Sequence, residues 1–271
     1  MAGSARRPRD RCKAEAVDDD RRSVAAKVFA IADAFDHPGS DALSLTSIAQ
    51  RAGLPLPTAH RIVGEWVHWG GLTRGDDGLY RVGLRFWMLG VRAASPRRLR
   101  TVALPHLEDL YELTRENVHL AVLDQQSALY LEHLSGPSAV PIVSDVGSRL
   151  PLHATGVGLV LLAHGGEDLF QSTLASRPTK FLPRTMTDER ALRRRLAEIR
   201  TVGYALSVNE MTDDSFSVAS PVRDHTGEVV AAVSIVAHAR AASDARLPLA
   251  VQIAARSISR ALGMRSSRDA T

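Results

Sequence analysis

The chain has 271 residues, 45% of them hydrophobic, which fits two modest globular domains and excludes disorder throughout. It contains neither an apolar run of about 18 residues nor the apolar stretch of a signal peptide, so it predicts a cytoplasmic protein without a membrane span. A single cysteine, Cys12, excludes an intrachain disulfide framework. Residues 1–100 contain 17 Lys and Arg against 11 Asp and Glu, which suits a polyanionic partner, although a basic surface is more often a solvated face.

Three helices are predicted between residues 23 and 71, after a tail, residues 1–22, that mixes charges of both signs and is predicted to be flexible. The first helix begins at the N-cap Ser23 and ends near Pro38; its apolar face consists of Val24, Val28, Ile31 and Phe35. A second helix ends at Gly53, and a third runs from about Pro57 to Gly70. Two helices joined by the tight turn Gly53-Leu54-Pro55 are typical of a helix-turn-helix.

A hairpin and a short apolar helix are predicted next. Leu72–Arg74 and Leu79–Val82 flank the turn sequence Gly75-Asp76-Asp77-Gly78, which predicts a β-hairpin wing and completes a DNA-binding domain over residues 23–83. Residues 84–96 then form a linker helix, broken at Ser95-Pro96, whose apolar stripe needs a partner such as a second copy of the chain. Its predicted dimer contacts are Trp87, Met88 and Val91.

Strands and helices alternate over residues 97–264, before a second short tail at residues 265–271. Strands are predicted at residues 118–122, 129–133, 140–146, 204–209, 217–223 and 229–238, and helices at residues 97–114, 154–164, 188–200 and 247–262. Hairpins between strands, with helices at both ends of the segment, favour an α+β domain over a doubly wound parallel sheet.

An ordered series of segments between Ser23 and Gly263 resembles the IclR-type (isocitrate lyase regulator) transcription regulators. The segments are Ser23-Val24, Leu45 to Pro55, Thr58 to Arg61, Tyr80 to Gly83, Asn117 to Leu120, Gly147 to Thr155, Gly203 to Ala205 and Ala219 to Asp224. The resemblance implies a winged helix-turn-helix, a dimerising linker helix and a GAF-like effector-binding domain. This chain departs from the family pattern at Leu56-Pro57, Asp214 and Ser217, so its operator preference and effector are not carried over from relatives.

The start of the third helix is the predicted DNA-reading surface. Thr58, His60 and Arg61 lie where a recognition helix meets base edges in the major groove, although His60 in particular also fits a solvated face. Two further groups are predicted to contact phosphates or flanking groove: Thr46, Ser47 and Arg51 on the preceding helix, and Arg74 and Arg81 on the wing.

The predicted effector site lies where the run Leu150 to Gly158 enters a helix, because the free N–H groups of a first helical turn suit a carboxylate. Its residues on this side are Leu150, His153, Ala154, Thr155 and Gly156. The family resemblance places Ser207, Ser217 and Ser234 opposite them; the alternative is that these serines only pair with neighbouring backbone. Glu210 and Asp214 fit either a cationic ligand group or a loop cap, and neither is assigned.

These features predict a regulator that binds double-stranded operator DNA as a homodimer or a dimer of dimers (a homotetramer) and responds to a small organic effector, a carboxylate or an aromatic metabolite. No cofactor or metal is expected. HExxH, G-x-S-x-G and Walker motifs are missing from the sequence, so an enzyme is not predicted. The alternative is a non-enzymatic ligand-binding or scaffold protein whose winged helix mediates protein contacts.

Overall fold

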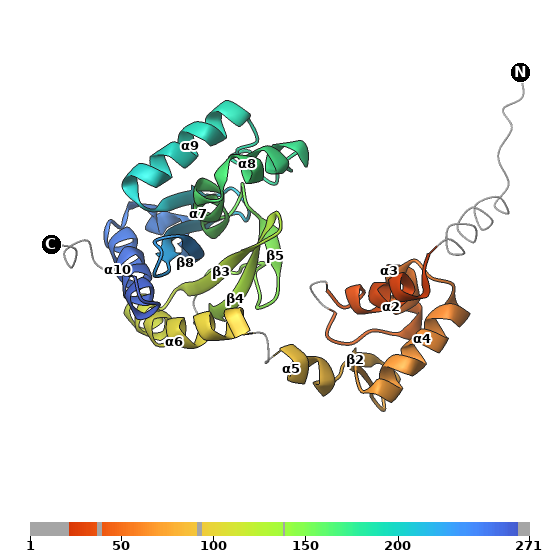
Figure 1. Ribbon diagram of the computed structural model, residues 1–271. Coiled ribbons are helices and arrows are strands. Elements are labelled where there is room, and N and C mark those ends of the chain that lie inside the picture. Colours follow the sequence, from red (N-terminus) through yellow and green to blue (C-terminus); the bar gives the residue numbers. More distant parts are fainter. Residues whose placement is uncertain (1–21, 37–39, 91–93, 138, 265–271) are drawn as a thin grey trace, which may run out of the picture. The chain divides into compact units, whose positions relative to one another are not determined.

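The computed structural model describes residues 22–36, 40–90, 94–137 and 139–264, and the chain divides into two compact units, Met1–Ala93 and Ala94–Thr271 (Figure 1). Each unit is described by itself. The two predicted tails and Val91 lie outside the described residues, apart from Arg22. None of the described helices is both long and apolar enough to cross a membrane.

Three helices build the first unit: α2 (Val24–Asp33), α3 (Leu45–Ala52) and α4 (Leu56–Trp69). The Ser23 hydroxyl caps α2 by accepting a hydrogen bond from the Ala26 N–H at 3.1 Å, as the sequence predicted. Gly53 ends α3 in the left-handed conformation, with a φ of 62°, and turns the chain into α4 within three residues. The helix-turn-helix is therefore fixed by local signals at its start and at its turn.

A small sheet completes this unit. Strands β1 (Leu72–Arg74) and β2 (Tyr80–Val82) pair antiparallel as the predicted wing. The segment before α3 also joins the sheet, because Leu43 and Tyr80 exchange two backbone hydrogen bonds of 2.9 and 2.8 Å. The core beneath the helices and sheet includes Ile31, Ile48, Ile62, Val63 and Leu72. Helix α5 (Leu84–Gly90) follows and has no buried residue.

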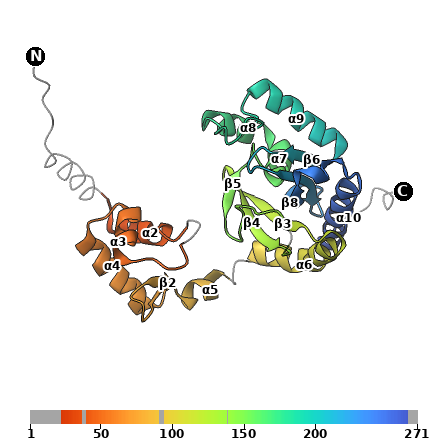
Figure 2. The same cartoon turned by 180° about the vertical axis from the view of Figure 1, so that it is seen from behind.

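The second unit is a six-stranded antiparallel sheet covered on both faces, which confirms the α+β class (Figures 1 and 2). Across the sheet the order is β5 (Arg149–Pro151), β4 (Ser127–Leu134), β3 (Asn117–Asp124), β8 (Val229–His238), β7 (Ser215–Arg223) and β6 (Ala205–Val208). Helices α6 (Ala94–Thr114) and α10 (Arg246–Ala261) pack on one face. The other face is covered by α7 (Gly156–His164), against which α8 (Gly166–Ala175) and α9 (Glu189–Val202) pack.

Two sequence predictions about elements are wrong. The strand predicted at residues 140–146 is irregular, because Pro141 has no N–H to donate and the edge strand instead forms downstream: Gly147 and Ser148 hydrogen-bond to Tyr130, leading into β5. The helix break predicted at Ser95-Pro96 is also wrong, because these residues lie in the first turn of α6, while α5 is described as far as Gly90. Proline is tolerated there because a first-turn N–H has no intrahelical acceptor.

Gly83 packs directly on the turn that ends α4, because a Cβ at this position would overlap the carbonyl oxygen of Gly70. We expect Gly83→Ala to lower the free energy of unfolding of the first unit by about 1–3 kcal/mol, as overpacking does. Gly64, on the exposed side of α4, has open space at the same position, so Gly64→Ala should raise that free energy by about 0.5–1 kcal/mol. Urea denaturation followed by tryptophan fluorescence measures both, since all three tryptophans lie in this unit. Equal effects of the two substitutions would contradict this packing.

Candidate DNA-binding and effector-binding sites

Helix α4 has one buried and one open side. Ala59, Ile62 and Val63 face the core, and His60 and Arg61 are exposed on the opposite side. Thr58, the third residue predicted on this surface, is half-buried at its edge. The structure therefore presents His60 and Arg61 together at the N-terminal end of α4, where a recognition helix contacts base edges.

Two of the three α3 residues predicted to contact phosphates form hydrogen bonds inside the protein. Thr46 is exposed, but the Ser47 backbone N–H donates to the capping hydroxyl of Ser44 at 3.1 Å, and the two hydroxyls lie 2.9 Å apart. Nη1 of Arg51 donates to the Ala34 carbonyl at 3.1 Å and to the Ser40 hydroxyl at 2.5 Å. Arg51 thus ties the end of α2 to α3, a structural role that differs from the predicted phosphate contact.

Both arginines of the wing contact neighbours on the hairpin. Arg81 forms a two-point ion pair with Asp77, with N–O distances of 2.5 and 3.1 Å, and the hydrogen bond from Arg81 lowers the pKa of Asp77 to about 2. The guanidinium of Arg74 lies over the ring of Tyr80 at 5.7 Å. Both side chains are held on the hairpin, so any DNA contact would use guanidinium N–H groups that remain open to solvent.

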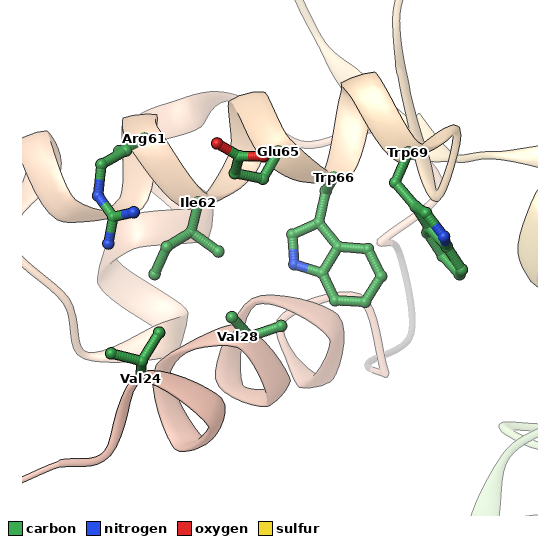
Figure 3. A pocket seen from close by; sticks show the side chains of 7 residues that line it. All are labelled: Val24, Val28, Arg61, Ile62, Glu65, Trp66 and Trp69. Atoms are coloured by element: carbon green, nitrogen blue, oxygen red, sulfur yellow. The ribbon is translucent and has the colours of Figure 1, made fainter.

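An apolar groove of about 330 Å³ lies between α2 and α4 (Figure 3). It is lined by Val24, Val28, Ile62, Trp66 and Trp69, with Arg61 and Glu65 also in its wall. Phe86 of α5 stacks on Trp66 at 5.0 Å and meets Trp69 edge-on at 5.5 Å.

Anchoring of α5 through Phe86 leaves the rest of that helix uncovered. Trp87 is 64% exposed and Met88 is 50% exposed, and Leu84 and Leu89 are exposed as well. Apolar patches of this kind are typical of interaction surfaces.

The predicted effector segment enters α7 as expected. Thr155 caps this helix, because its hydroxyl accepts from the Gly158 N–H at 3.1 Å. Gly156, the first residue of α7, lies against strand β7 so closely that a Cβ would overlap the Ser217 hydroxyl. The structure therefore brings together Gly156 and Ser217, which are 61 positions apart in the chain.

The other predicted effector residues differ in what they contact. Ser207 and Ser234 are buried on the same face of the sheet as Ser217: Ser207 pairs across from Ser217, and Ser234 pairs across from Ala219. Nε2 of His153 lies 2.9 Å from the Thr179 carbonyl oxygen, and burial lowers the pKa of its ring. Ala154 is buried, and Leu150 packs against the apolar core between α7 and the sheet.

His119, which was not among the predicted site residues, lies on the same face of the sheet. His119 pairs across from Ser234 on β8 and from His133 on β4, and its ring stacks on that of His133 at 4.7 Å. Its Nε2 lies 3.0 Å from the Ser144 hydroxyl, and burial lowers its pKa to about 3, so the ring is neutral near pH 7. The period-two alternation of Asn117 to Leu120 was the available signal, because it places a histidine opposite the apolar face of the strand.

A partly buried ion pair between Arg195 and Glu210 lies near Ser207. Oε1 of Glu210 accepts from Arg195 at 3.2 Å, and burial raises the pKa of the Glu210 carboxyl group. Asp214 instead pairs with Nδ1 of His238 at 2.6 Å on the surface. Within the described ranges no three histidine, cysteine or acidic side chains are placed to hold a metal ion.

Comparison with known proteins gives one consistent result. The family model described as the IclR helix-turn-helix domain matches residues 24–76, and the model for the bacterial transcriptional regulator IclR C-terminal domain matches residues 91–260. The regulator XynR of Escherichia coli is 32% identical over 88% of this chain and 96% of its own length. The glycerol operon regulatory protein of Streptomyces coelicolor is 33% identical over 83% of this chain and 91% of its own.

Solved structures agree with these relatives. An IclR homolog from Microbacterium hydrocarbonoxydans, crystallised with 4-hydroxybenzoate, is 38% identical and has a TM-score of 0.83, covering 89% of this chain and 99% of its own. The IclR protein of Thermotoga maritima is 29% identical with a TM-score of 0.68, covering 88% and 97%.

The internal contacts of Arg51 give a test that separates a structural role from a phosphate contact. We expect Arg51→Ala to lower the free energy of unfolding of the first unit by about 1–3 kcal/mol, because two hydrogen bonds of a charged group are lost. Thr46→Ala, on the exposed side of the same helix, should change it by less than about 0.7 kcal/mol. Tryptophan-detected urea denaturation without DNA measures both, and an unchanged stability of Arg51→Ala would show that the two hydrogen bonds do not matter.

Proposed function

The chain belongs to the IclR family of bacterial transcriptional regulators and is an effector-modulated DNA-binding protein; from this premise we propose that α4 reads operator DNA and that the α7-facing side of the larger sheet holds the effector. The observation that supports the first part most directly is the exposure of His60 and Arg61 together at the start of α4. In this account the protein acts in the cytoplasm and catalyses no reaction, in keeping with relatives that are regulators.

In the proposed operator complex, residues of α4 contact the bases, and residues of α3 and the wing contact the phosphates. Arg61 pairs with a guanine in the major groove, the commonest specific contact of this side chain, and His60 and Thr58 contact the adjoining bases or phosphates. Thr46 and Ser47 approach the backbone from α3, and Arg74 and Arg81 approach from the wing. Arg51 takes part only through N–H groups that its internal hydrogen bonds leave open.

The effector is proposed to be a small organic acid bound on the α7-facing side of the sheet, beside the start of α7 and strand β7. Two observations support this site: the buried Ser217 hydroxyl lies against Gly156, and the first turn of α7 offers N–H groups and a favourable helix dipole. The crystallised Microbacterium homolog bound an aromatic acid, 4-hydroxybenzoate. Thr155, Ser207 and Ser234 complete the polar surroundings.

We propose further that two copies of the chain associate through α5 and the groove between α2 and α4. The exposed apolar residues of α5, Trp87 above all, match an apolar groove on the same unit, so two copies related by a two-fold axis can cover each other. Val91 belongs to this proposed seam by sequence alone. Such a dimer, or a dimer of dimers, presents two α4 helices to half-sites about one helical turn apart.

Replacement of Arg61 tests the DNA-reading surface. Arg61→Ala should weaken binding to the operator by about 1–3 kcal/mol, or roughly 5- to 150-fold, because a bidentate base contact is lost. Arg190→Ala removes the same charge from the exposed start of α9 in the other unit and should leave affinity unchanged. Fluorescence anisotropy with DNA from upstream of the gene, at two salt concentrations and against a scrambled duplex, measures both. Normal operator binding by Arg61→Ala would rule out the proposed role of this residue.

Replacement of Trp87 tests the dimer seam. Trp87→Ser should shift the protein from dimer to monomer at micromolar concentration. The variant lacks the largest exposed apolar side chain of α5, so the dimer would bury less apolar surface. Leu123→Ser, which removes an exposed apolar side chain from the end of β3, should leave the mass unchanged. Light scattering after size exclusion gives the mass directly, and a Trp87→Ser protein that stays dimeric would place the interface elsewhere.

A further inference from the structure

Among the described residues, four buried side-chain polar atoms have no hydrogen-bond partner. Nε1 of Trp66 lies in the first unit, and Oε2 of Glu210 belongs to the carboxylate paired with Arg195. The other two are the hydroxyl oxygen of Ser217 and Nδ1 of His119, on the α7-facing side of the sheet. His119 is fully buried, and Ser217 is 9% exposed. Buried polar atoms in folded proteins are almost always paired, because leaving one unpaired costs free energy, and exceptions therefore point to a ligand or a functional role.

Ser220 shows that a buried serine in this strand can find a hydrogen-bond partner. The lack of a partner for the Ser217 hydroxyl is therefore specific to its position. Ser220 lies three residues further along β7, is buried as well, and donates its hydroxyl to the Gly203 carbonyl at 3.0 Å. Ser217 shares β7 with it but faces Gly156 and α7 instead. Ser217 and His119 thus both lie on the face where the effector is proposed to bind.

The sheet register fixes how far apart the two unpaired groups are. Ser217 pairs with Val236, which pairs with Asn117, and His119 lies two residues further along the same strand. Two inter-strand steps and two residues of strand rise give about 12 Å between the Cα atoms of Ser217 and His119. Both side chains leave the same face of the sheet, so their polar atoms are separated by roughly the same distance as their Cα atoms. With one hydrogen bond of about 2.8 Å at each end, the polar atoms of a bridging molecule would lie roughly 6–7 Å apart.

Each end favours a different chemical group. At the Ser217 end, the Gly158 N–H already donates to the Thr155 hydroxyl. The Ser217 hydroxyl and the two preceding N–H groups of α7 are the donors that suit a carboxylate. At the other end His119 is neutral, with Nε2 beside the Ser144 hydroxyl, so Nδ1 either donates or accepts one hydrogen bond. A hydroxyl group matches both possibilities, because it donates and accepts.

We propose that the effector is an aromatic hydroxy-acid whose carboxylate binds at Ser217 and the start of α7 and whose ring hydroxyl binds Nδ1 of His119. A benzene ring with para substituents spans the required distance, whereas a two- or three-carbon acid is too short to reach both groups. His119 is then the residue that selects hydroxylated over unsubstituted aromatic acids. This inference rests on the proposed effector site.

Binding must also open this face of the sheet. Both unpaired atoms have almost no solvent-exposed surface, so a ring that reaches them must displace side chains that cover them. The contact between Ser144 and His119 links the segment before β5 to the centre of the sheet. A ligand that binds His119 therefore acts on a segment outside the sheet as well as on the site itself.

The test is a titration of the full-length protein with 4-hydroxybenzoate and with benzoate, followed by calorimetry. The wild type should bind 4-hydroxybenzoate about tenfold or more tightly than benzoate, because a site that hydrogen-bonds a hydroxyl rejects the analogue that lacks it. His119→Gln keeps a polar atom near the position of Nε2 but none at Nδ1, and should bind both acids at the benzoate level. His119→Asn keeps one near Nδ1 and should retain part of the discrimination.

Two serine variants provide matched controls. Ser217→Ala should weaken both acids by about tenfold, since both carry the carboxylate, and should not lower the melting temperature, because no hydrogen bond is lost. Ser220→Ala should lower the melting temperature and leave both affinities unchanged. Pyruvate, which is too short to bridge the two ends, should bind no better than benzoate.

Three results would overturn the inference: equal affinity of the wild type for the two aromatic acids, full discrimination by His119→Gln, or no binding of either acid. Operator binding, measured on the same preparations, keeps this failure distinct from failure of the proposed function. A protein that binds operator DNA but neither aromatic acid is a regulator with a different effector. A folded protein that binds no operator contradicts the proposed DNA-reading role instead.

Discussion

Burial of both faces of the six-stranded sheet is the constraint on which the effector unit depends. Along β3, β7 and β8 alternate side chains point to opposite faces, so Val118, Val218 and Ile235 enter the core beneath α6 and α10. Their neighbours in sequence necessarily face α7, and there the chain places small or polar residues such as His119, Ser217 and Ser234. Stability and recognition are thus divided between the two faces of the same strands.

A similar division operates on the DNA-reading unit. Ile62 and Val63 hold α4 in the core, which leaves His60 and Arg61 open on the other side of the helix. Near its end α4 stacks Trp66 on Phe86, and this contact fixes α5 while leaving its remaining apolar residues uncovered. The helix proposed to read DNA therefore also forms one wall of the proposed dimer groove, so changes in association and changes in DNA contact act through the same element.

Local signals in the sequence predict most helices and strands. Contacts between residues that are distant in the sequence could not be predicted. The Ser23 cap, the left-handed Gly53 and the wing turn follow from single residues and their neighbours. The strand expected at residues 140–146 does not form, because Pro141 has no N–H to donate and residues 149–151 pair with β4 instead. The hydrogen bonds of Arg51 to Ala34 and Ser40 arise only in the folded unit, and the missing partner of His119 is visible only once its neighbours are in place.

Coupling between the two units is the central claim, and reciprocity tests it most directly. If the effector and the operator bind one protein whose conformational states they favour differently, each must change the affinity of the other by the same factor, typically about 5- to 150-fold. Operator affinity should be measured with and without saturating 4-hydroxybenzoate, and the affinity for 4-hydroxybenzoate with and without operator. Equal factors that differ from one are the expected result. Both ligands binding with affinities independent of each other would contradict the account.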